Sequence, residues 1–136
     1  VTFLPLTWGA AWGAVSVTVA GPASSQTLPL SGSGVDFGLA VNAIQVVRGG
    51  SANTAYTVAA LGGTYSNPVS LTCGNLPKGA TCSFAQNPAT PGANGLTSTL
   101  TITTVKGTQT GTYWIVIVGA SSTGQHSVNS ALTVTK

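Results

Sequence analysis

Apolar and polar residues alternate with a period of two along most of the chain, which is the pattern of β-strands. Turns that contain Gly or Pro separate these segments at roughly the 8–12-residue spacing of an all-β sandwich. The expected strands are VSVTVAG and QTLPLSG, which form a hairpin, followed by GLAVNAIQVV, TAYTVAAL, PVSLTC, TCSFAQ, TSTLTITTV, TYWIVIVGA and VNSALTVT. The side chains expected to face the core are Val58, Val69, Leu71, Phe84, Leu100, Ile102, Tyr113, Ile115, Ile117, Leu132 and Val134.

The stretch GTYWIVIVGA, residues 111–120, departs from this pattern because both of its faces are apolar. Alternation places Tyr113 and two isoleucines on one face, and Trp114, Val116 and Val118 on the other. One face of a strand in a small domain normally meets water, so the second apolar face predicts a contact with something else. Tyr113, at the start of this late strand, is expected to form a tyrosine corner.

Charged residues make up only 4% of the chain, against about 25% in ordinary globular proteins. Asp36 is the only acidic residue, and the net charge of +3 comes from Arg48, Lys78, Lys106 and Lys136. These basic residues are scattered along the sequence, whereas nucleic-acid binding needs them clustered, so no nucleic-acid partner is expected. A surface with so few charges indicates that another chain or domain covers part of it.

The uncharged stretch FLPLTWGAAWGAVSVTVA, residues 3–20, is long enough to cross a bilayer as a helix. Pro5, Gly9 and Gly13 interrupt it, however, and its valines alternate with polar Ser16 and Thr18. That alternation has the period of a strand, so we expect a strand here and no membrane span.

The later part of the chain contains the segments PVSLTCGNLPKGATCSFAQNPATPG, STLTITT, GTYWIVIVGASS and ALTVTK. On these segments, residues 36–136 resemble the immunoglobulin-like repeats of bacterial secreted and surface proteins. The core LTC-x-NLP-x-GATCSF is quite specific to that family. The resemblance implies a complete immunoglobulin-like β-sandwich, an extracellular or cell-surface location and no enzymatic activity.

The preceding segment, residues 1–35, contains VTF-x-P, the spaced Gly9 and Gly13, and SQTLPLSGSGV. On these features it is similar to the last strands of a different immunoglobulin-like module, the ASPM–SPD-2–Hydin type, which often precedes such repeats in tandem arrays. Residues 1–35 are therefore expected to form an N-terminal β-hairpin extension, the terminal strands of an incomplete module. Gly32 and Gly34 are expected to form a linker turn, because no helix follows them to bind phosphate.

Two departures from these families mark candidate interface residues. The repeats usually carry threonines where this chain has Trp114, Val116 and Val118. Trp8 and Trp12 likewise stand where the upstream module commonly carries polar residues. Burying an apolar side chain of this size contributes roughly 1.5–3 kcal/mol, so packing against another subunit is the favoured explanation. Chance substitution combined with packing against the adjacent hairpin is the alternative.

Cys73 and Cys82 flank the short loop GNLPKGAT, which contains Pro77. Two cysteines this close on neighbouring strand ends, in a chain of secreted composition, indicate a structural disulfide. A zinc site needs more ligands than two Cys and one His supply, and a redox pair prefers C-x-x-C before a helix.

The sequence offers little for catalysis or metal binding. His126, the only histidine, lies in the polar stretch SSTGQHS, where an exposed loop position is expected, and only Asp36 could pair with it. A hydrolytic triad needs a nucleophile, a base and an orienting group, a glycosidase needs two carboxylates, and a calcium site needs several oxygen ligands. No catalytic, cofactor-binding or metal-binding residues are therefore expected.

These observations favour a non-enzymatic structural protein, a subunit or repeat of a surface filament or pilus-like fibre. Its partners would be copies of itself or neighbouring immunoglobulin-like domains, joined head-to-tail. The alternative is a carbohydrate-binding or spacer module of a secreted hydrolase or adhesin, with surface glycans as partners and the tryptophans as stacking platforms. Against sugar binding, aliphatic residues surround Trp114, and Trp8 and Trp12 lie among Gly and Ala.

The N-terminal hairpin needs a partner, because an isolated two-stranded hairpin is marginal in water. Val15, Val17 and Val19 are expected to add to a neighbouring module by strand complementation, with Leu28 and Leu30 on the same buried face. The alternative is that the hairpin folds back onto the sandwich of its own chain.

Overall fold

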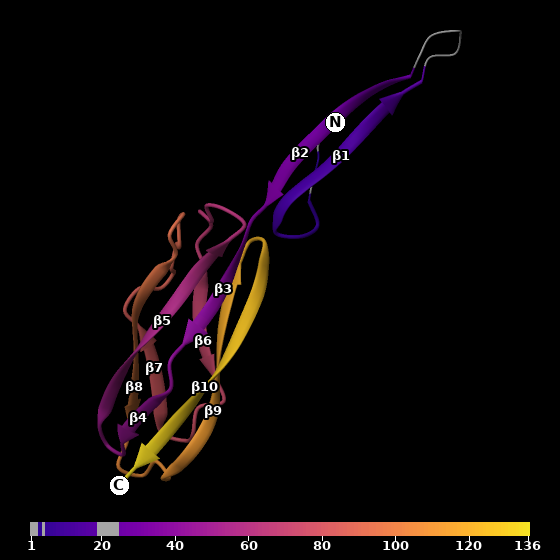
Figure 1. The fold of residues 1–136 in the computed structure, drawn as a ribbon. Coiled ribbons are helices and arrows are strands. Elements are labelled where there is room, and N and C mark those ends of the chain that lie inside the picture. The colour runs from indigo at the N-terminus through magenta and orange to yellow at the C-terminus, as the bar shows by residue number, and fades with distance from the viewer. Residues whose placement is uncertain (1–2, 4, 19–24) are drawn as a thin grey trace.

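The computed structural model describes residue 3, residues 5–18 and residues 25–136. This part of the chain contains ten strands, which form one two-stranded hairpin and two four-stranded sheets. Figure 1 shows the two sheets packed as a sandwich, with the hairpin projecting from one end and the C-terminus at the other. The prediction of an all-β sandwich with an N-terminal hairpin is confirmed.

The hairpin consists of β1 (Gly9–Val17) and β2 (Gln26–Gly34), which pair antiparallel with Val15 opposite Leu28. β1 begins well before the expected VSVTVAG, because the preceding GAAWGA also pairs with β2. The segment PASS, expected from its Pro22 to form the turn between the two strands, lies outside the described residues except for Ser25. The described segments include no helix that is long and apolar enough to cross a membrane.

The two sheets of the sandwich are named here the β8 sheet and the β9 sheet. The order of the β8 sheet is β3 (Asp36–Val41), β5 (Ser51–Leu61), β8 (Leu96–Thr104) and β7 (Ala80–Phe84). The order of the β9 sheet is β4 (Ile44–Val47), β10 (Gly124–Thr135), β9 (Gly111–Ser121) and β6 (Ser70–Gly74). Neighbouring strands are antiparallel except β4 and β10, which are parallel.

The segment GLAVNAIQVV was expected to be one strand, and this expectation is wrong. The chain leaves the β8 sheet after Val41 and enters the β9 sheet at Ile44. The Ser130 hydroxyl donates a hydrogen bond to the Asn42 carbonyl over 2.9 Å and holds the crossing. In one continuous strand Val41 and Ile44 would lie on opposite faces, yet both pack in the core, so the alternation shifts at the crossing although neither Gly nor Pro marks it.

The core lies between the two sheets and matches the expected inward residues. Nine of them are buried, and Phe84 and Tyr113 are partly buried against the same cluster. The core also contains residues that the pattern did not single out: Phe37, Ile44, Val46, Tyr56, Tyr65 and Ala89. Tyr65 lies outside the named strands, where its backbone bridges to Gly92, so strand periodicity could not identify it.

The disulfide between Cys73 and Cys82 is present, with 6.5 Å between the Cα atoms. Cys73 lies on β6 and Cys82 on β7, which are edge strands of different sheets. The bond therefore joins the two layers at one edge of the sandwich, rather than neighbouring strands of one sheet.

The tyrosine corner predicted at Tyr113 is also present. The phenol hydroxyl donates to the backbone carbonyl of Gln109, four residues upstream, over 3.0 Å. This bond fixes the loop that leads into β9.

The expected linker turn at Gly32 and Gly34 is wrong, because both residues belong to β2 and only Val35 separates β2 from β3. The backbone is packed tightly at this junction. A Cβ atom on Gly34 would lie 2.0 Å from the Thr7 carbonyl oxygen, and one on Gly62 would lie 2.3 Å from the Gly34 oxygen. The Ser33 hydroxyl donates to the Gly62 carbonyl over 2.9 Å. Glycine thus allows three backbone segments to meet where the hairpin leaves the sandwich.

Candidate interaction surfaces

The outer face of β9 carries the apolar stripe of Trp114, Val116 and Val118. Trp114 is 68% exposed and the two valines are half-buried, while Ile115 and Ile117 point into the core. The hairpin projects away from the sandwich and does not cover this stripe (Figure 1). Packing of the stripe against the hairpin of the same chain is therefore wrong, and its contact with another subunit remains a prediction.

The neighbours of the stripe within the β9 sheet are small or uncharged. Ala131 of β10 lies opposite Trp114, and Thr72 of β6 lies opposite Val118. Such short neighbours cannot shield an indole, so the ring stands above the sheet surface. The result is an apolar strip on an outer face that has no charged residue on its strands.

The outer face of the β8 sheet is different, because hydroxyl and amide side chains pair across its central strands. The Ser51 and Thr103 hydroxyls lie 2.8 Å apart, and those of Thr57 and Thr97 lie 2.9 Å apart. The Thr101 hydroxyl donates to the Asn53 side-chain oxygen over 2.9 Å. The polar side chains of this face hydrogen-bond to one another, and the face is compatible with exposure to water. The outer face of the β9 sheet is therefore the one that exposes apolar side chains.

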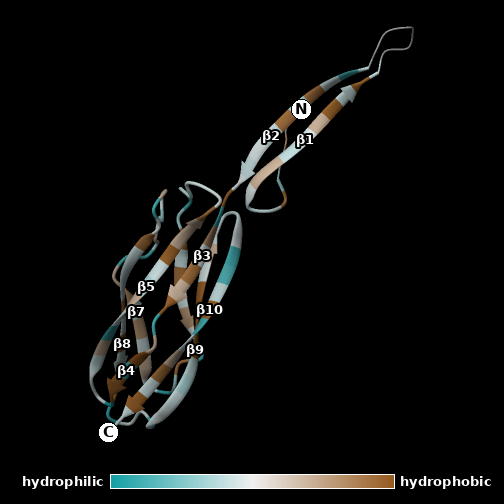
Figure 2. Cartoon of the chain, in the orientation of Figure 1, coloured by the Kyte–Doolittle hydropathy of each residue, from teal (hydrophilic) through white to brown (hydrophobic). Residues whose placement is uncertain are grey.

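The two faces of the hairpin are both partly apolar. Val15 and Val17 share one face with Leu28 and Leu30, as expected, and Trp12 lies on the other, 77% exposed. Val17 and Leu28 are 56% and 63% exposed. Val19 lies outside the described residues. Figure 2 shows that apolar colouring continues from the sandwich into both strands of the hairpin.

Phe3 covers the glycine-rich part of that first face. Cβ atoms built on Gly13 and Gly32 would lie 3.2 and 2.9 Å from its ring. The ring thus occupies the space that side chains at these two positions would fill. Beyond it, toward the hairpin tip, Val17 and Leu28 remain more than half exposed.

The hairpin does not fold back onto its own sandwich, so this alternative is wrong. None of its residues belongs to the core cluster, and β1 and β2 pair only with each other among the described strands. Each strand therefore has one edge with unpaired backbone groups. Strands in that state readily accept a further strand.

A cleft of about 550 Å³ lies at the junction between the hairpin and the sandwich. Trp8, 61% exposed, lines it together with the polar side chains of Asp36, Gln125 and His126. In the sequence Trp8 has only small neighbours, but the fold brings polar groups to it from β3 and β10. Polar groups that a sugar could contact therefore lie beside Trp8, contrary to the expectation from its sequence neighbours.

His126 lies on β10 and is half-buried, so the expected loop position is wrong. Its Nε2 atom lies 3.0 and 3.1 Å from the two carboxylate oxygens of Asp36. Its ring meets Phe37 edge-on, with 4.8 Å between the ring centroids. The Phe37 backbone N–H also donates to Asp36 over 2.8 Å. The described residues contain no group of three or more His, Cys, Asp and Glu side chains that could hold a metal ion.

Comparisons with known proteins identify the fold. No protein-family model matches the sequence, and no curated protein matches it. Among solved structures, the chain is similar to domains 4 and 5 of the S-layer protein SbsC, at 19% identity over 93% of this chain and 77% of that one, with a TM-score of 0.52. A longer SbsC structure, rSbsC(31-844), matches at 20% identity and a TM-score of 0.51 over 96% of this chain, which spans only 17% of its length.

The titin M3 domain is also similar, at 12% identity over 75% of this chain and 97% of that domain, with a TM-score of 0.45. At these identities the likeness concerns the fold alone. The chain thus has an immunoglobulin-like β-sandwich fold of the kind seen in SbsC domains.

Proposed function

We propose that this chain is a non-enzymatic, extracellular structural module that works in contact with other immunoglobulin-like modules. The observation that carries the proposal is the hairpin, which stands apart from its own sandwich with apolar side chains exposed and both outer edges unpaired among the described strands. A two-stranded ribbon of this kind is marginal in water, so a neighbouring module would stabilise it.

The contact that fits this ribbon best is strand complementation. A neighbouring module, from another copy or from a longer chain, would add a strand to β1 or β2 and cover Val15, Val17, Leu28 and Leu30. Residues 1–35 then act as the terminal strands of a module that the neighbour completes. A head-to-tail contact of this kind does not close on itself, so repeating it generates a fibre or a layer.

The likeness to SbsC supports this proposal at the level of fold. The match to SbsC domains 4 and 5 spans 93% of this chain, so it extends beyond the sandwich into the hairpin. SbsC is an S-layer protein with several domains. A cell-surface location is also consistent with the disulfide, since such bonds persist in oxidising compartments.

The apolar stripe on β9 provides a second contact surface in this proposal. Trp114, Val116 and Val118 lie on the sandwich, whereas the hairpin contact lies beyond its end. Contacts of two kinds, one along the molecule and one across it, would be needed to build a layer rather than a single fibre.

Sedimentation velocity over a range of concentrations, with negative-stain microscopy of the same samples, tests the proposal. The full chain should form concentration-dependent assemblies. A Val17→Thr/Leu28→Thr variant should weaken them, and Ser51→Thr on the polar face should leave them unchanged. A full chain that stays monomeric at every concentration contradicts the proposal.

Glycan binding is the second candidate function, and the junction cleft favours it. Trp8 offers an exposed aromatic side chain there, and the Asp36 carboxylate and the Gln125 amide also line the cleft. An apolar platform with a few polar groups is typical of small-ligand sites. Quenching of tryptophan fluorescence by neutral oligosaccharides, lost in Trp8→Ala and kept in Trp12→Ala, supports this function. Equal quenching in both variants contradicts it.

A further inference from the structure

All four basic side chains gather at one end of the sandwich, although they lie far apart in the sequence. Arg48 follows β4, Lys78 precedes β7, Lys106 follows β8 and Lys136 follows β10. Each of the four is exposed. The only acid, Asp36, begins β3 at the opposite end, beside the hairpin. We call the four residues Arg48, Lys78, Lys106 and Lys136 the basic end.

Backbone contacts hold the basic end together. The Arg48 N–H donates to the Thr135 carbonyl over 3.0 Å, so Arg48 and Lys136 emerge side by side from the parallel pair β4 and β10. A Cβ on Gly49 would lie 3.0 Å from the Cγ atom of Lys106, which places the turn after β4 directly against that lysine.

The loop that carries Lys78 contacts the loop that carries Lys106. The Val105 N–H donates to the Gly79 carbonyl over 3.1 Å, so the loops before β7 and after β8 touch. The only side-chain carboxylate, that of Asp36, contacts His126 at the opposite end of the sandwich. The basic end therefore presents cationic side chains that no side-chain carboxylate of the described residues contacts.

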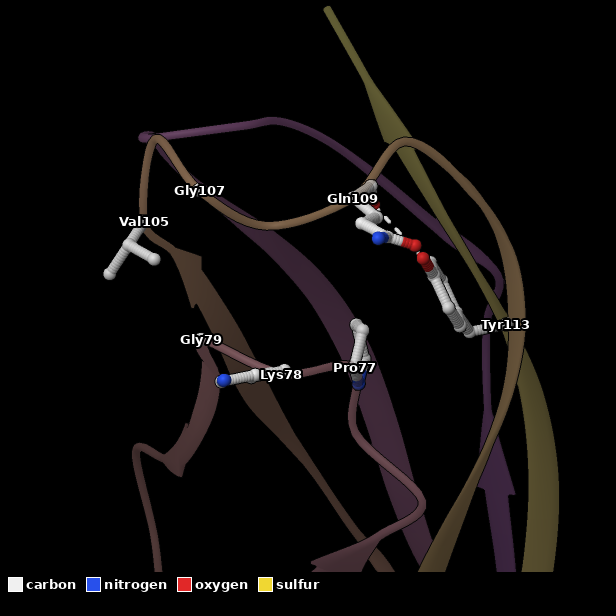
Figure 3. A pocket seen from close by; sticks show the side chains of 7 residues that line it. All are labelled: Pro77, Lys78, Gly79, Val105, Gly107, Gln109 and Tyr113. Carbon is white, nitrogen blue, oxygen red and sulfur yellow. Dashed lines mark hydrogen bonds between the residues drawn. The ribbon is translucent and has the colours of Figure 1, made fainter.

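A cleft of about 570 Å³ opens between these two loops. Figure 3 shows Lys78 on one side of it, Gln109 and Tyr113 on the other, and Pro77 between them. The cleft thus combines a cation, an amide and a tyrosine ring over a buried proline.

We propose that the basic end binds an acidic polysaccharide, a polymer whose sugar rings carry carboxylate, sulfate or phosphate groups. Lysines are mobile point charges that suit anionic groups spaced along a flexible polymer. The cleft beside Lys78 offers the half-buried Tyr113 ring as apolar surface for a sugar ring and the exposed Gln109 amide for its hydroxyls. This binding needs neither the hairpin contact nor the β9 stripe.

Two other anionic partners, nucleic acid and a membrane surface, fit the basic end less well. Nucleic acid is disfavoured because the disulfide points to an oxidising compartment outside the cytosol. An anionic membrane is disfavoured because the exposed apolar residues beside the cations are Val47 and Val105, whereas surface-bound segments insert Trp, Phe or Leu.

Binding to immobilised polysaccharides tests the proposal. The probes are polygalacturonate, dextran sulfate and neutral dextran, at low and high NaCl concentration. We expect the full chain to bind polygalacturonate or dextran sulfate and to be released by salt, because salt screens exposed charges. Retention on polygalacturonate alone would identify carboxylate as the preferred anionic group, and retention on dextran sulfate alone would identify sulfate. Equal retention on neutral dextran overturns the proposal.

Charge variants connect this binding to the basic end. Lys78→Gln/Lys106→Gln should weaken it about threefold to tenfold, because single exposed ion pairs are weak. Lys78→Arg/Lys106→Arg keeps the charges and should restore it, and thermal unfolding should be unchanged in both. If Lys78→Gln/Lys106→Gln binds the acidic polysaccharide as tightly as the original chain, the proposal is overturned. Tighter binding to anionic lipid vesicles or to a DNA duplex than to either acidic polysaccharide overturns it as well.

Discussion

The imidazole of His126 and the carboxylate of Asp36 lie 3.0 Å apart at the point where the hairpin leaves the sandwich, although 90 positions separate them in the sequence. Asp36 is the first residue of β3, and His126 lies near the start of β10. Their contact ties the first strand of the sandwich to the last one, next to the only residue between β2 and β3. It therefore connects the stability of the sandwich edge to the base of the hairpin.

A double-mutant cycle measures this contact. His126→Phe keeps an aromatic ring against Phe37 and removes the bond to Asp36, while Asp36→Asn keeps an acceptor for the Phe37 N–H. Since both side chains are partly exposed, we expect a coupling free energy of only about 0.2–1 kcal/mol in urea unfolding. Strictly additive effects of the two substitutions would show that the pair does not stabilise the fold.

The disulfide should stabilise the sandwich without being required for folding. Cys73→Ala/Cys82→Ala should lower the free energy of unfolding by about 2–3 kcal/mol, because the bond restricts a short loop in the unfolded chain. The buried cluster between the sheets does not depend on the bond, so the variant should keep its β-sheet circular dichroism. A variant that is unfolded in the absence of denaturant contradicts this prediction.

The glycine junction should be needed to hold the hairpin in place. Gly34→Ala puts a Cβ 2.0 Å from a backbone oxygen of Thr7, which no side-chain rotation can relieve. We expect faster amide hydrogen exchange in β1 and β2, with unchanged exchange in the core strands β8 and β9. Gly107→Ala is the matched control, because a Cβ there meets no atom within 4 Å. If amide hydrogen exchange in the hairpin of Gly34→Ala is unchanged, the glycine junction is not needed to hold the hairpin in place.

The β9 stripe should matter for assembly and not for folding. Trp114→Thr/Val116→Thr/Val118→Thr changes only outward side chains, so thermal unfolding of the sandwich should shift little. Assembly measured by sedimentation velocity should weaken. Thr97→Val/Thr99→Val on the β8 sheet is the control for changes of surface polarity. Assembly that is unaffected by the triple substitution would remove the stripe from the interface.

Much of the fold could be predicted from local pattern and spacing. Alternation placed Val15 and Leu28 on one face of the hairpin and identified most of the core, and the short loop between Cys73 and Cys82 predicted their bond. The position of Tyr113 at the start of a late strand predicted a tyrosine corner, which its bond to Gln109 forms. Each of these features depends on residues that are close in the sequence or on a period that one strand carries by itself.

The features that the sequence did not reveal all depend on how distant strands meet. The spacing of Val41 and Ile44, which both pack in the core, is a local sign of the change of sheet at Asn42, but the strand that the chain joins there is set by the distant β10. The contact of His126 with Asp36 and the polar groups beside Trp8 exist only because β3 and β10 both begin beside the hairpin. The basic end is formed by three turns and the residue after β10, from four separate parts of the chain, which is why its residues looked scattered.

Hydrogen exchange of the hairpin, measured at increasing protein concentration, tests the central claim most directly. In the single chain, the outward backbone N–H groups of β1 and β2 have no strand partner among the described residues and should exchange quickly. If a neighbouring module adds a strand, exchange at these amides should slow as assemblies form, while amides of β8 stay unchanged. Assemblies that form without any slowing of exchange in β1 or β2 would contradict strand complementation by this hairpin.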